Sequence, residues 1–120
     1  MKTPRQKLIK KLDTIWSRIV RKAGVCEAIS RPGACVGSLQ AAHIIRRGNN
    51  SVRWDIDNGL CLCVKHHYWF DKGDKFEVTE WFNRKWPGRQ ERLKEVNQIT
   101  HYKLHDLENI YARLKEINLD

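Results

Sequence analysis

Residues 53–73 read RWDIDNGLCLCVKHHYWFDKG and combine a turn, an apolar run and the start of a polar helix in one short stretch. The run from Gly59 to Val64 is short and apolar, as in a buried strand, and a second such run, LQAAHII, covers residues 39–45. Between the two runs, turn residues accumulate and no helical period is present. The sequence therefore predicts two strands on either side of an irregular loop.

Helical periodicity flanks this central section on both sides. In residues 1–24, apolar side chains recur at offsets of three and four, which predicts an amphipathic helix ending near Gly24. Later periodic stretches predict three more helices, around residues 78–82 before Pro87-Gly88, around residues 93–99 and over residues 104–117. The 120 residues are expected to form one α+β domain, with a basic N-terminal helix (1–24), a core (25–73) and a helical C-terminal scaffold (74–120).

The chain is strongly basic. It holds 23 Lys and Arg against 14 Asp and Glu, a net charge of +9, which favours polyanionic partners such as nucleic acid or an anionic membrane. Residues 1–24 carry eight of these basic residues and Asp13 as their one acid. This segment is interpreted either as a solvated helix face or as a track for a nucleic-acid backbone.

The apolar stretches are too short to span a bilayer, and no signal peptide follows Met1, so we expect a cytoplasmic protein. In that reducing compartment, cysteines bind metal or stay as thiols. Two pairs of ligands about 30 residues apart predict a structural zinc, and our ligand set is Cys26, Cys35, Cys63 and His66. Cys61 would share a strand face with Cys63, so a four-cysteine site that frees His66 remains an alternative.

Four further polar residues stand in positions that suggest a functional role. His43 lies inside the apolar run 39–45, and Asn58 closes the turn-rich loop before the second strand. His67 and Asp71 are four residues apart, which on a helix puts an imidazole and a carboxylate on one face, suited to one divalent cation.

Taken in order, a His at the end of a strand, an Asn closing a loop and a His beginning a helix beside a Cys-x-x-His knuckle resemble the HNH endonucleases of the ββα-metal class. The segments LQAAHII, RWDIDNGLCLC and HHYWFDKG look most like the small HNH endonucleases encoded by bacteriophages. The resemblance implies a small ββα-metal core with a zinc knuckle, flanked by N-terminal and C-terminal helices. It also implies a DNA substrate, the host cytoplasm as location, and phage packaging or recombination proteins as partners.

The same resemblance implies a division of labour among the polar residues. His43 would act as general base on a water, Asn58 would hold the loop that orients it, and His67 with Asp71 would bind the catalytic metal. Mg²⁺ or Mn²⁺ is favoured, with Ni²⁺ or Zn²⁺ as alternatives, and no organic cofactor is expected. Ala42 stands where many relatives have a metal-ligating Asp or His. Phosphate contacts are expected from Arg46, Arg47 and Arg53.

A competing hypothesis is a non-catalytic, zinc-stabilised DNA-binding module. It explains the basic charge and the zinc ligands without any convergence of His43, His67 and Asp71. The two hypotheses differ in whether these three side chains meet at one place. A pure binding module has no use for a general base beside a second metal site.

Overall fold

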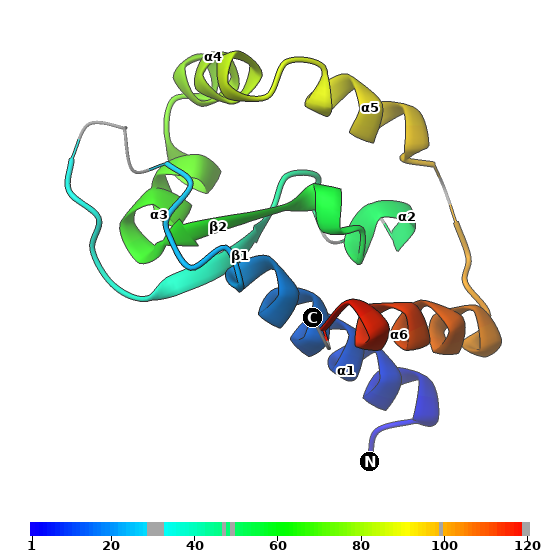
Figure 1. Ribbon diagram of the computed structural model, residues 1–120. Coiled ribbons are helices and arrows are strands. Elements are labelled where there is room, and N and C mark those ends of the chain that lie inside the picture. Colours follow the sequence, from blue (N-terminus) through cyan, green and yellow to red (C-terminus); the bar gives the residue numbers. More distant parts are fainter. Residues whose placement is uncertain (29–32, 47, 49, 99, 119–120) are drawn as a thin grey trace.

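The computed structural model describes residues 1–28, 33–46, 48, 50–98 and 100–118. Its elements in chain order are α1 (Pro4–Arg21), β1 (Leu39–His43), α2 (Asn50–Arg53), the short 3-10 helix η1 (Ile56–Asn58), β2 (Gly59–Cys63), α3 (Val64–Lys72), α4 (Lys75–Lys85), α5 (Arg89–Val96) and α6 (Leu104–Asn118). Figure 1 shows the small sheet between α1 and α6 on one side and α4 and α5 on the other. The α+β class and the ββα arrangement are confirmed.

The sheet is a two-stranded antiparallel ladder. Leu39 lies opposite Cys63 and His43 lies opposite Gly59. Both predicted strands are present, and each is slightly shorter than its apolar run. The loop between them holds α2 and η1, which are four and three residues long and therefore too short to give a helical period in the sequence.

The N-terminal helix forms where its pattern predicts it. Thr3 and Gln6 make a reciprocal capping box around the first turn, and Pro4 occupies a position where no N–H is needed. The helix ends at Arg21, and Gly24 follows with a φ of 75°. The helices predicted around residues 78–82 and 104–117 are also present, whereas α5 ends at Val96 and Ile99 lies outside the described residues.

The apolar face of α1 packs against both α6 and the sheet. This core buries Leu12, Ile15, Trp16, Ile19, Val20, Trp54, Cys61, Leu107 and Leu114. Helix and strand approach so closely that a Cβ at Gly59 would lie 2.5 Å from a Val20 methyl and 2.9 Å from the Trp16 ring. Glycine at position 59 is therefore required by the contact between α1 and β2.

A second core fills the other side of the sheet. It buries Ala42, Leu60 and Leu62 against the aromatic residues of α4, with Trp69, Phe70 and Trp86 at its margin. These aromatic side chains pack as core, but the neighbouring Tyr68 is 71% exposed. No helix in the described part of the chain is long and apolar enough to cross a membrane.

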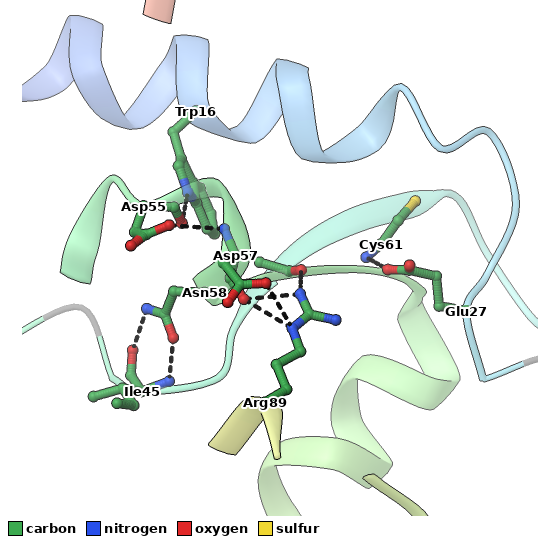
Figure 2. A network of polar contacts seen from close by, with 9 residues as sticks. Trp16, Glu27, Ile45, Asp55, Asp57, Asn58, Cys61 and Arg89 are labelled. Carbon is green, nitrogen blue, oxygen red and sulfur yellow. Dashed lines mark hydrogen bonds and ion pairs between the residues drawn. The ribbon is translucent and has the colours of Figure 1, made fainter. Parts of the chain in front are cut away.

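Arg89 at the start of α5 ties the C-terminal helices to the sheet. Its guanidinium donates hydrogen bonds to the carbonyls of Asp57 (2.8 and 3.0 Å) and Gly59 (3.0 Å), and it pairs with the Asp57 carboxylate (Figure 2). The side chain is nearly buried, stacks over Trp86, and has its pKa lowered from the ordinary value by that burial. Arg89 thus brackets Asn58, since its two acceptor residues are the neighbours of Asn58.

Replacing Arg89 by Met should lower the free energy of unfolding by about 2–4 kcal/mol, because buried main-chain carbonyls lose charged donors. Urea denaturation of the zinc-loaded protein measures this change. The matched control is Arg92→Met, which removes an exposed guanidinium from the same helix. Equal midpoints for the two variants would contradict the bracing role of Arg89.

Candidate metal centres and catalytic site

Four predicted zinc ligands converge at the junction of β2 and α3. The ligand atoms of Cys26, Cys35, Cys63 and His66 all lie within 4.8 Å of one another. The three sulfurs lie 3.4, 3.6 and 3.2 Å from Nδ1 of His66. Zn–S bonds of about 2.3 Å and a Zn–N bond of about 2.0 Å at tetrahedral angles give S···N edges of about 3.5 Å, so the set fits tetrahedral zinc.

Local structure explains why these side chains meet. Cys63 is the N-cap of α3 and its sulfur accepts the His66 backbone N–H, so the Cys-x-x-His spacing brings both side chains together in the first turn. The carboxylate of Glu27, the residue next to Cys26, accepts the backbone N–H of Cys61 at 2.7 Å (Figure 2). The backbone N–H of Glu27 donates to the Cys61 carbonyl at 2.8 Å. This pairing places the Cys26 loop beside β2.

The thiols of the cluster differ in their readiness to ionise. Burial opposes ionisation of Cys63, but backbone hydrogen bonds from His66 and Val36 outweigh it and lower the pKa to about 6. Desolvation and the neighbouring thiols of Cys26 and Cys63 raise the pKa of Cys35 to about 11. The thiolate is the form that binds metal, so the backbone N–H groups that face Cys63 favour the ligand form of this thiol.

Cys61 lies outside this cluster. Its thiol packs in the core beside α1, whereas Cys63 packs on the opposite side of the sheet. The expectation that the two cysteines share a strand face is therefore wrong, because Cys63 ends the strand and turns its side chain to cap α3. The four-cysteine alternative has no geometric support among the described residues.

His43 ends β1 with its ring held on two sides. Nε2 lies 2.9 Å from the carbonyl of Arg53, and the ring stacks on Trp16 at a centroid distance of 3.9 Å and an angle of 11°. A carbonyl only accepts hydrogen bonds, so this contact selects the tautomer with its proton on Nε2. Nδ1 then carries the lone pair that a general base needs.

The carbonyl that holds His43 belongs to a residue that is itself fixed. Two guanidinium nitrogens of Arg53 donate to the Asp13 carboxylate at 3.1 and 2.7 Å, and the Trp54 indole donates to the same carboxylate at 2.9 Å. Trp16 in turn donates from its indole to the Asp55 carbonyl at 2.9 Å. Helix α1 therefore anchors the inter-strand loop at several points.

Asn58 is fully buried and closes the same loop. Its Oδ1 accepts the backbone N–H of Ile45 at 2.7 Å, and its Nδ2 donates to the Ile45 carbonyl at 3.0 Å (Figure 2). Nδ2 also donates to the carbonyl of Val52 at 3.0 Å. The amide thus continues the ladder where β1 ends, two residues after His43. These hydrogen bonds fit the expectation that Asn58 holds the loop that orients His43.

His67 and Asp71 lie on one face of α3, as the spacing predicts. His67 Nε2 is 3.2 Å from Asp71 Oδ2, and His67 Nδ1 is 2.7 Å from Oε1 of Gln40 on β1. Oε1 of Gln40 therefore accepts a hydrogen bond from Nδ1–H of His67, which leaves the Nε2 lone pair directed toward Asp71. Two adjacent octahedral ligands at about 2.1 Å from Mg²⁺ stand about 3.0 Å apart, so the pair fits two corners of such a site.

These side chains share one cavity of about 670 Å³ between α1, the end of β1, α3 and α4. Its lining includes His43, Arg46, His67 and Asp71, together with Asp13 and Trp16 of α1. Ala42 is fully buried in the second core and adds no ligand, so water and substrate oxygens would complete the coordination.

The three predicted phosphate-binding arginines have different surroundings. Arg46 is exposed at the cavity, and Arg47 lies outside the described residues. Arg53 is mostly buried and bonded to Asp13, which leaves little of its guanidinium for DNA. Sequence reasoning missed Gln40, Asp13 and Trp16, since their roles depend on tertiary contacts across 27 to 40 residues of chain.

Replacing Cys63 by Ser should weaken zinc binding by more than about 100-fold, because it removes a thiolate ligand. Metal analysis of the purified protein and competition with a chromophoric chelator measure the loss. Cys61→Ala is the matched control, since it removes a buried thiol of the same strand outside the cluster. Zinc loss in the control with retention in Cys63→Ser would refute this ligand set.

Comparison with known proteins adds one match. Residues 23–75 match the family model described as HNH endonuclease. Neither the search of curated proteins nor the search of solved structures found a match. The matched segment contains the Cys₃His cluster, both strands and α3, and so includes His43, Asn58, His67 and Asp71. Over residues 23–75, the chain is therefore similar to the HNH endonucleases.

Proposed function

We propose that the protein is a metal-dependent endonuclease that hydrolyses phosphodiester bonds in duplex DNA. The observation that carries this proposal is the shared cavity of His43 and the His67–Asp71 pair. A binding module has no need to place an oriented imidazole beside a second set of metal ligands. The family match supports the nuclease class, and the geometry supports the assignment of roles.

In this proposal, His43 is the general base. Nδ1 takes a proton from a water whose oxygen attacks phosphorus, and the bond from phosphorus to the 3′ oxygen breaks. The leaving oxygen takes up a proton from solvent. Because Nε2 donates to the Arg53 carbonyl, the imidazolium formed in this step keeps that hydrogen bond while Nδ1 carries the new proton.

His67 Nε2 and Asp71 Oδ2 would hold the catalytic cation, with Gln40 fixing the His67 ring from behind. When bound, a divalent cation neutralises charge on the phosphate and on the leaving oxygen. Two protein ligands leave most coordination positions to water and phosphate oxygens, which is typical of Mg²⁺ and Mn²⁺ sites. The zinc cluster serves a structural role in this scheme, because it fixes the start of α3 next to His67.

Wild-type protein should convert supercoiled plasmid to the open-circular form when Mg²⁺ or Mn²⁺ is added, with nicking before linearisation if one centre acts alone. His43→Ala should slow the conversion by about 10² to 10⁴-fold, because it removes the general base. The assay adds and omits the divalent cation and avoids chelators, so that the zinc centre stays loaded. The matched control is His101→Ala, which removes an exposed histidine outside the cavity.

Two results would overturn the proposal. One is the lack of conversion with any divalent cation by folded, zinc-loaded protein that binds DNA, which would favour the zinc-stabilised binding module. The other is equal cleavage by His43→Ala and wild type.

A further inference from the structure

Helix α1 lies outside the matched segment and carries much of the unpaired charge of the molecule. Its exposed side chains include Lys7, Lys10, Lys11 and Arg18. In the described part of the chain, no ion pair with an acidic residue neutralises any of the four. The neighbouring Lys10 lowers the pKa of Lys2, as expected where ammonium groups crowd without counter-charges.

The basic side chains follow the edge of the cavity. Asp13, Trp16 and Ser17 of α1 line the cavity. Helical spacing puts Lys10 one turn before Asp13 and Arg21 one turn after Ser17, so that these residues form one row along the helix. Arg21 donates to the Ser17 hydroxyl at 3.2 Å, which fixes its place in this row.

A second row extends the positive surface away from the cavity. Lys7 lies one turn before Lys10, and Lys11 directly follows Lys10. Arg18 lies next to Ser17 and one turn before Arg21 on the exposed face. The opposite face of α1 is covered by the sheet and by α6. On the far rim of the cavity, exposed Lys72 and Lys75 add further positive charge.

We infer that the exposed face of α1, defined by Lys7, Lys10, Lys11, Arg18 and Arg21, binds the phosphate backbone of the DNA whose scissile phosphate enters the cavity. The inference rests on the proposed function for the identity of the substrate. The 18 residues of α1 span about 27 Å, which matches about eight base pairs of duplex. The contacts are to phosphate, so they add affinity without sequence preference.

The test measures duplex binding by a protein that cannot cut. In a His43→Ala background without added divalent cation, a fluorescent duplex of about 20 base pairs is titrated at several salt concentrations. Neutralising three lysines of α1 should weaken binding roughly 100-fold at 0.1 M salt and reduce the salt slope by about two to three. The variant combines Lys7→Gln, Lys10→Gln and Lys11→Gln.

A matched control removes the same number of charges from exposed positions at and before α6. It combines Lys103→Gln, Arg113→Gln and Lys115→Gln. An equal loss in the two triple variants, or an unchanged salt slope in the α1 variant, would overturn the inference. Because binding is read without cleavage, a nuclease that fails the plasmid assay leaves this test intact. Binding of α1 to anionic vesicles, with unchanged DNA binding in the α1 variant, would also overturn it.

A separate observation concerns Asp13, the one acid among the eight basic residues of the N-terminal segment. It accepts two hydrogen bonds from Arg53 and one from Trp54, and the Arg53 carbonyl accepts from His43. We infer that Asp13 is a positioning residue for the general base. Its carboxylate fixes Arg53, and Arg53 fixes the tautomer and the direction of the His43 ring.

Asp13→Ala should lower kcat about tenfold while the zinc content stays near wild type. Nitrogen NMR shifts of the imidazole should show a loss of the Nε2-protonated form of His43. Trp54→Phe is the control, because it removes one hydrogen bond to Asp13 and leaves the Arg53 pair in place. An unchanged His43 tautomer in Asp13→Ala would overturn the inference, whether or not the protein cleaves DNA.

Discussion

The contact of the Trp16 indole with the sheet is the constraint on which the remaining structure depends. This ring is nearly buried, donates to the Asp55 carbonyl, stacks on His43, and lies so close to β2 that residue 59 must be glycine. One side chain thus belongs to the core, anchors the inter-strand loop and supports the proposed base. Packing density leaves little freedom in any of these three contacts, so each one restricts the others.

Two candidate metal sites with different ligand chemistry share the short helix α3. His66 faces the cysteine sulfurs on one side, while His67, the next residue, faces Gln40 and Asp71. Consecutive helical residues point about 100° apart, so adjacent histidines serve separate sites without competing for one ion. Soft thiolates would favour zinc at the first site, and a carboxylate with open positions would suit a harder cation at the second.

Much of this arrangement could be predicted from the sequence. Strand runs, helical periods and the ligand spacings all depend on local order, which is why the ββα core and the four-residue cluster could be placed from residues 26–71. The residues that hold His43 and His67 in place could not be predicted from the sequence. From the sequence alone, Asp13 is one acid on a basic helix, Arg53 is expected to contact DNA, and Gln40 is one polar residue in an apolar run. Their roles come from contacts between distant segments, which periodicity does not record.

The candidate site includes residues that lie outside the segment matched by the family model. Residues 23–75 supply the ligands and the proposed base, but the ring beneath His43 comes from α1, and the guanidinium that brackets Asn58 comes from α5. The segment is therefore not a transferable module in this chain. A graft of residues 23–75 into another scaffold would bring every ligand with it, yet its imidazole would lack the surface that holds it still.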